Sequence, residues 1–173
     1  DQILKTFSLD EKIAHFEELA PQYLEIWEEI FAYLPNFEKV FVHRDFHVDN
    51  LFFLKNSEVG ILDYQDCVFS SPIYDLVSLL DDARIDVSFQ LRDKMLDYYC
   101  QITNFAKSDV LLAYNILAAQ RNTRVLGVFA RKALNGNNNY LPMMDRVVNY
   151  LVQNLAHPAL MPLKAWMQNN KIF

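Results

Sequence analysis

The feature that most constrains the fold of this chain is a polar segment, residues 43–50, that lies between two short apolar runs. The runs cover residues 40–42 and 51–54, and they are rich in the β-branched and aromatic residues that are typical of buried strands. A third apolar run, residues 59–62, follows a polar turn and predicts a β-hairpin with residues 51–54. The pattern therefore predicts short strands whose ends carry polar side chains, where functional groups are often placed.

Three polar side chains at these strand ends suit phosphoryl transfer. Asp45 and Asn50 lie in the polar segment, and Asp63 directly follows the third apolar run. In this reaction a carboxylate orients an attacking hydroxyl and accepts its proton, while oxygen ligands hold Mg²⁺ on the nucleotide phosphates. We therefore expect Asp45 to be the catalytic base, with Asn50 and Asp63 as ligands of Mg²⁺. The alternative is that Asp45, Asp49 and Asn50 are ordinary turn formers.

The order of these residues is similar to that of a known superfamily. Residues 43–50 read HRDFHVDN and residues 61–66 read ILDYQD. They resemble the H-G-D-x-H-x-x-N loop and the following I-D motif of the aminoglycoside phosphotransferase and choline kinase superfamily, with Arg44 in place of the glycine. The resemblance implies an α+β, mostly helical fold, namely a protein-kinase-like C-terminal lobe whose small β-hairpin carries the catalytic and metal loops. It also implies ATP as co-substrate together with Mg²⁺.

Three features separate the chain from protein kinases. His47 occupies a position where Ser/Thr kinases have lysine, and residues 63–65 read DYQ instead of the usual DFG. Only 11 residues lie between Asp63 and Asp75, which leaves no room for a segment that binds a peptide substrate. The short connection predicts a site that is open to a small molecule.

A narrower resemblance covers most of the chain from about residue 40 onward. Residues 63–66, 74–83 and 120–131 look like segments of bacterial anomeric kinases that phosphorylate N-acetylmuramate and N-acetylglucosamine. This implies a sugar or amino-sugar substrate. Aminoglycoside, choline and homoserine kinases stay open as alternatives within the enzyme class. An alternative from another class is a non-catalytic binding or scaffold module that has retained a kinase-like loop.

The resemblance also assigns supporting roles. His43 is expected to pack beneath the loop and to hydrogen-bond the backbone near Asp63. His47 has two readings, a role close to the phosphates or the metal ion, or plain loop structure. Asp75 lies at a predicted helix N-terminus, where a carboxylate is favourable, and by resemblance it accepts hydrogen bonds from backbone N–H groups of the catalytic loop.

Further carboxylates follow the metal motif. Asp66, Asp81 and Asp82 are candidate substrate-binding residues, because they lie after the strand that carries Asp63. The alternative is that the carboxylates form a solvated surface, as runs of like charge usually do.

Composition limits the remaining function classes. The 173 residues suit a single domain, 1–173, and 52% of them are hydrophobic, which allows a substantial core. A net charge of −6 argues against a nucleic-acid partner, and no apolar run approaches the ~20 residues of a membrane span. Cys67 and Cys100 have no metal or redox spacing, so we interpret them as reduced packing residues of a cytoplasmic protein.

Glycine is the most informative residue count, because there are only three. A kinase needs a glycine-rich loop so that backbone N–H groups can approach the phosphates, and this chain has none. We therefore expect it to be the C-terminal lobe of a longer enzyme. The missing N-terminal lobe of the same polypeptide would be its partner, and the fragment alone would have little or no activity.

Helical periodicity covers most of the remaining chain. Apolar spacing predicts helices before residue 34, with a break at Pro21. Further helices are predicted to begin near residue 72 and to cover residues 87–105, 109–134, 141–156 and 159–169.

Overall fold

The computed structural model describes residues 9–56 and 58–172, with side chains from residue 17 onward. Helices dominate this part of the chain, and the strands are short and paired in twos. The elements, where η marks a 3₁₀ turn, run in the order α1 (Leu9–Phe31), β1 (Val40–Val42), η2 (Val48–Asn50), β2 (Leu51–Phe53), β3 (Val59–Ile61), β4 (Val68–Ser70), α2 (Tyr74–Leu80), α3 (Phe89–Thr103), α4 (Lys107–Leu134), η3 (Asn138–Tyr140), α5 (Leu141–Asn154), η4 (Pro158–Leu160) and α6 (Met161–Asn169).

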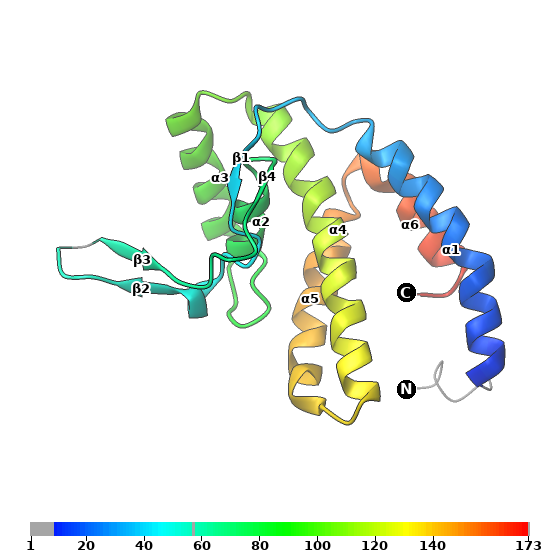
Figure 1. The fold of residues 1–173 in the computed structure, drawn as a ribbon. Coiled ribbons are helices and arrows are strands. Elements are labelled where there is room, and N and C mark those ends of the chain that lie inside the picture. Colours follow the sequence, from blue (N-terminus) through cyan, green and yellow to red (C-terminus); the bar gives the residue numbers. More distant parts are fainter. Residues whose placement is uncertain (1–8, 57, 173) are drawn as a thin grey trace.

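Helix α4 is the centre of the helical part of the molecule (Figure 1). It packs against α2, α3 and α5. Three of its alanines, Ala113, Ala118 and Ala119, are fully buried, and their small side chains allow neighbouring helices to approach closely. The predicted helix over 109–134 is therefore confirmed, with its start at Lys107.

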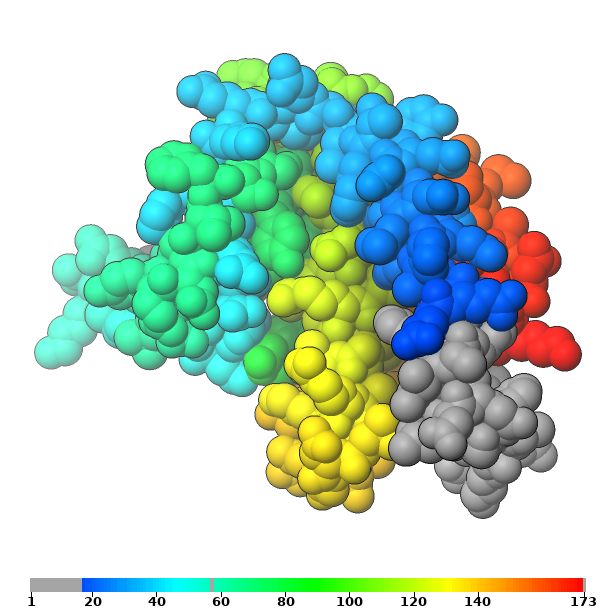
Figure 2. All heavy atoms as spheres, turned by 45° about the vertical axis from the view of Figure 1, so that its right-hand side comes forward, coloured from blue at the N-terminus to red at the C-terminus, as the bar shows by residue number. Residues whose placement is uncertain are grey.

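The core lies on two sides of α4. One cluster packs α2 and α3 against α4 beneath the strands and contains Ile73, Val77 and Val110, none of which has exposed surface. The second cluster packs α1 and α6 against α4 and includes Trp27 and Leu163. Figure 2 shows α1 in blue beside α6 in red on the side of the molecule away from the strands.

The strands form two antiparallel pairs. β2 pairs with β3, so that Leu51 lies opposite Ile61 and Phe52 opposite Gly60. This confirms the predicted hairpin, which projects away from the helices (Figure 1). A Cβ atom at Gly60 would collide with the Phe52 ring, so glycine allows the ring to lie across the partner strand. β1 pairs with β4, and the sequence pattern did not predict β4.

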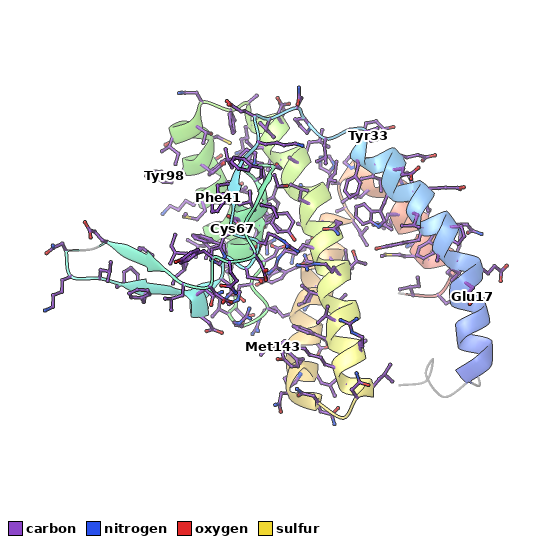
Figure 3. The ribbon with its side chains drawn as sticks, in the orientation of Figure 1. Glu17, Tyr33, Phe41, Cys67, Tyr98 and Met143 are labelled. Atoms are coloured by element: carbon purple, nitrogen blue, oxygen red, sulfur yellow. The ribbon has the colours of Figure 1, made fainter. Side chains whose placement is uncertain are left out.

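The prediction that these strands are buried is wrong for most of their side chains. Phe41 on β1, Phe53 on β2 and Phe69 on β4 are 64%, 88% and 71% exposed. Figure 3 labels Phe41 on β1, above Cys67 in the segment before β4. Each sheet has only two strands, so one face of each pair has no covering layer among the described residues.

The predicted helix break at Pro21 is also wrong, because α1 continues through this residue. Proline removes one backbone hydrogen bond to the residue four positions earlier, here Glu17. Both Pro21 and Glu17 are exposed, so water can satisfy the free carbonyl. Trp27 and Ile30 on the opposite face are buried against α6, and this packing outweighs the local cost.

Within the described residues, none of the helices combines the length and the apolar character that crossing a membrane requires.

Candidate functional site

The segment between β1 and β2 places Asp45 and Asn50 side by side. Arg44 has a φ of 74°, in the left-handed region that favours glycine, and this explains why related loops have glycine at this position. The turn leaves the Asp45 side chain exposed. The Asn50 side-chain amide then donates to the Asp45 backbone carbonyl at 2.9 Å. Asn50 therefore closes the loop onto the candidate base.

The hairpin register brings Asp63 to the same place. Leu62 N–H donates to the Asn50 backbone carbonyl at 2.9 Å, and Asp63 is the next residue. Asp63 also has a positive φ, 64°, a strained geometry that often occurs at functional sites. Gln65 donates to Asp63 Oδ1 at 2.7 Å, which leaves Oδ2 open to a ligand.

The donor set fits Mg²⁺. Both N–H bonds of the Asn50 amide are used, one by Asp45 and one by His47 Nε2 at 3.4 Å, so Asn50 Oδ1 is free. A carboxamide oxygen and a carboxylate oxygen are hard ligands, and Mg²⁺ commonly takes only one or two protein ligands beside phosphates and water. No cluster of three or more His, Cys, Asp or Glu side chains suitable for a metal occurs within residues 17–56 and 58–172.

Helix α2 holds the catalytic loop by its backbone. Asp75 accepts hydrogen bonds from the backbone N–H groups of His43 at 2.7 Å and Arg44 at 2.9 Å, which is the contact that the resemblance implied. One helical turn later, Ser78 Oγ donates to the Arg44 carbonyl at 3.3 Å. The spacing of three residues places both side chains on one face of α2. The loop is therefore fixed on both sides of the residue that has positive φ.

The two histidines connect the loops. His43 Nε2 donates to the Leu62 carbonyl at 2.7 Å, close to Asp63 as expected. His47 is buried, and burial together with the charge of Arg84 lowers its pKa. A neutral ring can accept from Asn50 at Nε2, so the structure places His47 beside the candidate metal ligand.

Two of the candidate substrate carboxylates are buried, contrary to the expectation that they border a pocket. Asp81 and Asp82 have no exposed surface. Asp81 accepts from Tyr114 at 2.7 Å and Asn122 at 2.8 Å, and both partners lie on α4. Burial and the neighbouring Asp81 raise the pKa of Tyr114 well above its ordinary value, so the tyrosine stays a donor to this carboxylate.

Asp82 has a structural contact with the catalytic loop. Its carboxylate accepts from Val48 N–H at 3.3 Å, at the start of η2, and pairs with Arg84 at 3.2 Å. Arg84 also pairs with Asp49 at 2.7 Å. Asp66, by contrast, is exposed, and its backbone carbonyl accepts from Arg44.

Sequence reasoning missed a buried polar network beneath the loop. Arg121 on α4 is 5% exposed and donates to Ser78 Oγ at 3.1 Å, while Arg92 on α3 pairs with Asp81 at 3.4 Å. The available signal was the presence of arginines within otherwise apolar helical faces, since arginine is rarely buried without a partner. The network ties α2, α3 and α4 together under Arg44.

A mostly helical domain that presents such a loop at the ends of short strands falls in the class of phosphotransferases. The family model described as "phosphotransferase enzyme family" matches residues 4–111, and the chain belongs to this family.

Three similar proteins carry the name N-acetylmuramate/N-acetylglucosamine kinase. The one from Caulobacter vibrioides is 38% identical over 147 residues, which is 82% of this chain and 40% of that protein. Those from Neisseria meningitidis and Pseudomonas aeruginosa are 36% and 31% identical over 121 residues, which is 65% of this chain and 36% of each relative. The chain thus spans 40% or less of the length of these relatives.

Proposed function

We propose that this chain is the catalytic-loop lobe of an ATP-dependent kinase that phosphorylates a hydroxyl of an amino sugar. The observation that carries the proposal is the joint position of three residues. Asn50 contacts the backbone of Asp45 through its side chain and the residue before Asp63 through its own carbonyl. The printed names of the relatives support an amino sugar as the substrate.

In the proposed mechanism, Asp45 orients the attacking hydroxyl and accepts its proton. Its carboxylate is exposed, while its backbone is held by Asn50 and by the bonds of the preceding Arg44 to α2. Asn50 Oδ1 and Asp63 Oδ2 are the oxygens that would hold Mg²⁺. When bound, this ion neutralises charge on the transferred phosphate. The fixed loop therefore supplies positioning, which is the main requirement of phosphoryl transfer.

We infer that the exposed strand face receives the nucleotide-covering part of the same polypeptide. Phe41 and Phe69 face each other across β1 and β4 with ring centroids 6.0 Å apart, and both are exposed. The relatives are more than twice as long as their matched segments, and this sequence contains no glycine-rich loop. In this arrangement the lobe alone has little or no activity.

The test uses the protein encoded by the complete open reading frame, incubated with Mg·ATP and N-acetylmuramate, N-acetylglucosamine, kanamycin or choline. We expect ADP release with an amino sugar. Release with kanamycin or choline alone would keep the mechanism and reject the substrate class. Absence of ADP release together with absence of Mg·ATP binding would reject the proposal in favour of a non-catalytic module.

A further inference from the structure

A cavity of about 250 Å³ lies directly behind the catalytic loop, between strands β1 and β4 and helices α2 and α4. Its wall contains two guanidinium groups, from Arg44 and Arg124. An amide, a hydroxyl and a phenol add further polar groups. The remaining lining residues are Val42, Val68, Ser70, Tyr74 and Gln120.

The two arginines of this cavity have free hydrogen-bonding capacity. Among the described residues, Arg44 makes one side-chain hydrogen bond, from Nη1 to the Asp66 backbone carbonyl at 3.4 Å, and Arg124 makes one, to the Tyr74 hydroxyl at 3.4 Å. A guanidinium has five N–H donors. Neither group forms an ion pair with a carboxylate of the described residues, and no acidic side chain lines the cavity.

Arg121 provides a useful contrast on the same helix. It is 5% exposed, and its guanidinium bonds to Ser78 and to the Asp81 carbonyl, so its role is structural. Arg124 is one turn further along α4 and is exposed. The chain has a net charge of −6, so carboxylates outnumber cations, yet no carboxylate of the described residues pairs with Arg44 or Arg124.

The geometry points to this cavity as the site for a carboxylate substituent of the sugar substrate. This inference rests on the proposed function and deepens it. Paired guanidiniums bind a carboxylate through parallel, charge-assisted hydrogen bonds. A volume of about 250 Å³ is below that of pockets that enclose a whole ligand, but it suits one substituent.

The location of the cavity supports a substrate contact. Arg44 directly precedes Asp45, and consecutive Cα atoms are about 3.8 Å apart. In this proposal the carboxylate contact and the base belong to neighbouring residues of one loop, and the sugar ring with its lactyl substituent spans the distance between them. N-acetylmuramate is N-acetylglucosamine with a lactyl ether that ends in a carboxylate, so the same ring can occupy the site with or without this contact. A polycationic aminoglycoside would be repelled by the same groups.

The experiment measures discrimination between these two sugars. We would determine kcat/KM for each sugar, and the affinity of each by calorimetry, in the protein from the complete open reading frame. The Arg124→Gln variant should reduce the preference for N-acetylmuramate over N-acetylglucosamine by roughly tenfold or more, because charge-assisted hydrogen bonds are lost. The Arg131→Gln variant removes an exposed arginine from the same helix and should keep the wild-type ratio.

The outcomes separate this inference from the proposed function. If both sugars are phosphorylated and Arg124→Gln keeps the wild-type ratio, the carboxylate site is wrong and the kinase assignment stands. If the wild-type protein binds N-acetylmuramate no more tightly than N-acetylglucosamine, the carboxylate site is equally refuted. If neither sugar binds or is phosphorylated, both proposals fail.

Discussion

The two loops that carry the proposed chemistry are held in different ways. The catalytic loop, residues 43–50, is bound to a buried scaffold, since Asp75, Ser78 and Asp82 contact four of its backbone groups. Ser78 and Asp82 have no exposed surface. The metal loop, residues 62–67, has exposed side chains through most of its length.

The metal loop depends on the catalytic loop for its position. At Leu62, the backbone carbonyl accepts from His43 and the N–H donates to Asn50, while the Asp66 carbonyl accepts from Arg44. The difference indicates a hierarchy in which helices fix the catalytic loop and the catalytic loop fixes the metal loop. Loss of a catalytic-loop anchor should therefore disturb both loops, whereas a change in the metal loop should stay local.

The largest expected effect is on turnover in a variant of Asp45, the proposed base on the catalytic loop. Asp45→Asn removes the proposed base and leaves the exposed surface otherwise similar, so kcat should fall by about 100-fold to 10,000-fold. The melting temperature should stay close to that of the wild type, because the side chain is exposed. Turnover and thermal unfolding of the complete protein provide the two measurements. Near-wild-type turnover would remove Asp45 from the mechanism.

Asp75→Asn tests the hierarchy most directly. The two carboxylate oxygens of Asp75 each accept a hydrogen bond from a backbone N–H group of the loop. In asparagine an NH₂ group replaces one of these oxygens, so one backbone donor loses its acceptor, and each unsatisfied donor costs about 1–3 kcal/mol. We expect the free energy of unfolding to fall by about 2 kcal/mol and Mg·ATP affinity to fall as well.

Asp66→Asn is the matched control for Asp75→Asn, because it makes the same change at an exposed position of the metal loop. Surface substitutions usually change stability by less than about 0.5 kcal/mol. Chemical denaturation of both variants gives the comparison. Equal destabilisation by the two substitutions would contradict the hierarchy.

Ser78→Ala should have an intermediate effect. It removes the donor to the Arg44 carbonyl and leaves the Arg121 Nε–H, in a buried network, without its acceptor. The expected loss in the free energy of unfolding is about 1–2 kcal/mol. Denaturant unfolding measures this loss, and the slope of the free energy of unfolding against denaturant concentration should stay at the wild-type value. A free energy of unfolding equal to that of the wild type would contradict the prediction.

The comparison of the loops also explains what could be predicted from the sequence. The hairpin and the order of Asp45, Asn50 and Asp63 follow from local patterns, because strand pairing across a short turn is encoded by adjacent residues. The burial of Asp81 and Asp82 was not predicted, since a carboxylate run looks alike in the sequence whether it is solvated or buried. Their burial depends on partners such as Asn122, 41 residues away from Asp81.

The same distinction applies to the backbone. The sequence departs from related loops at Arg44, and only the structure shows that this residue has a φ of 74°. Strand β4 was missed because its partner β1 lies 28 residues earlier, with Val42 opposite Val68 at the nearer end. Likewise, the break expected at Pro21 rested on the low helix propensity of proline. The packing of Trp27 and Ile30, both on α1, against α6 outweighs that local preference.

The smallest expected effect is on the pH dependence of the free energy of unfolding, and it comes from a histidine outside both loops. Burial lowers the pKa of His157 below 6.5, and its Nδ1 accepts from Ala159 N–H at the start of η4. Below about pH 6.5 the unfolded chain takes up a proton that the folded chain resists, so stability should fall as pH decreases. The slope contributed by one histidine is at most about 1.4 kcal/mol per pH unit.

His157→Asn isolates this contribution, because asparagine can accept the same N-terminal hydrogen bond and does not titrate. We expect the variant to lose part of the pH dependence of unfolding between about pH 7.5 and pH 5.5, with little change at the upper value. An unchanged slope would show that His157 takes up its proton equally in both states.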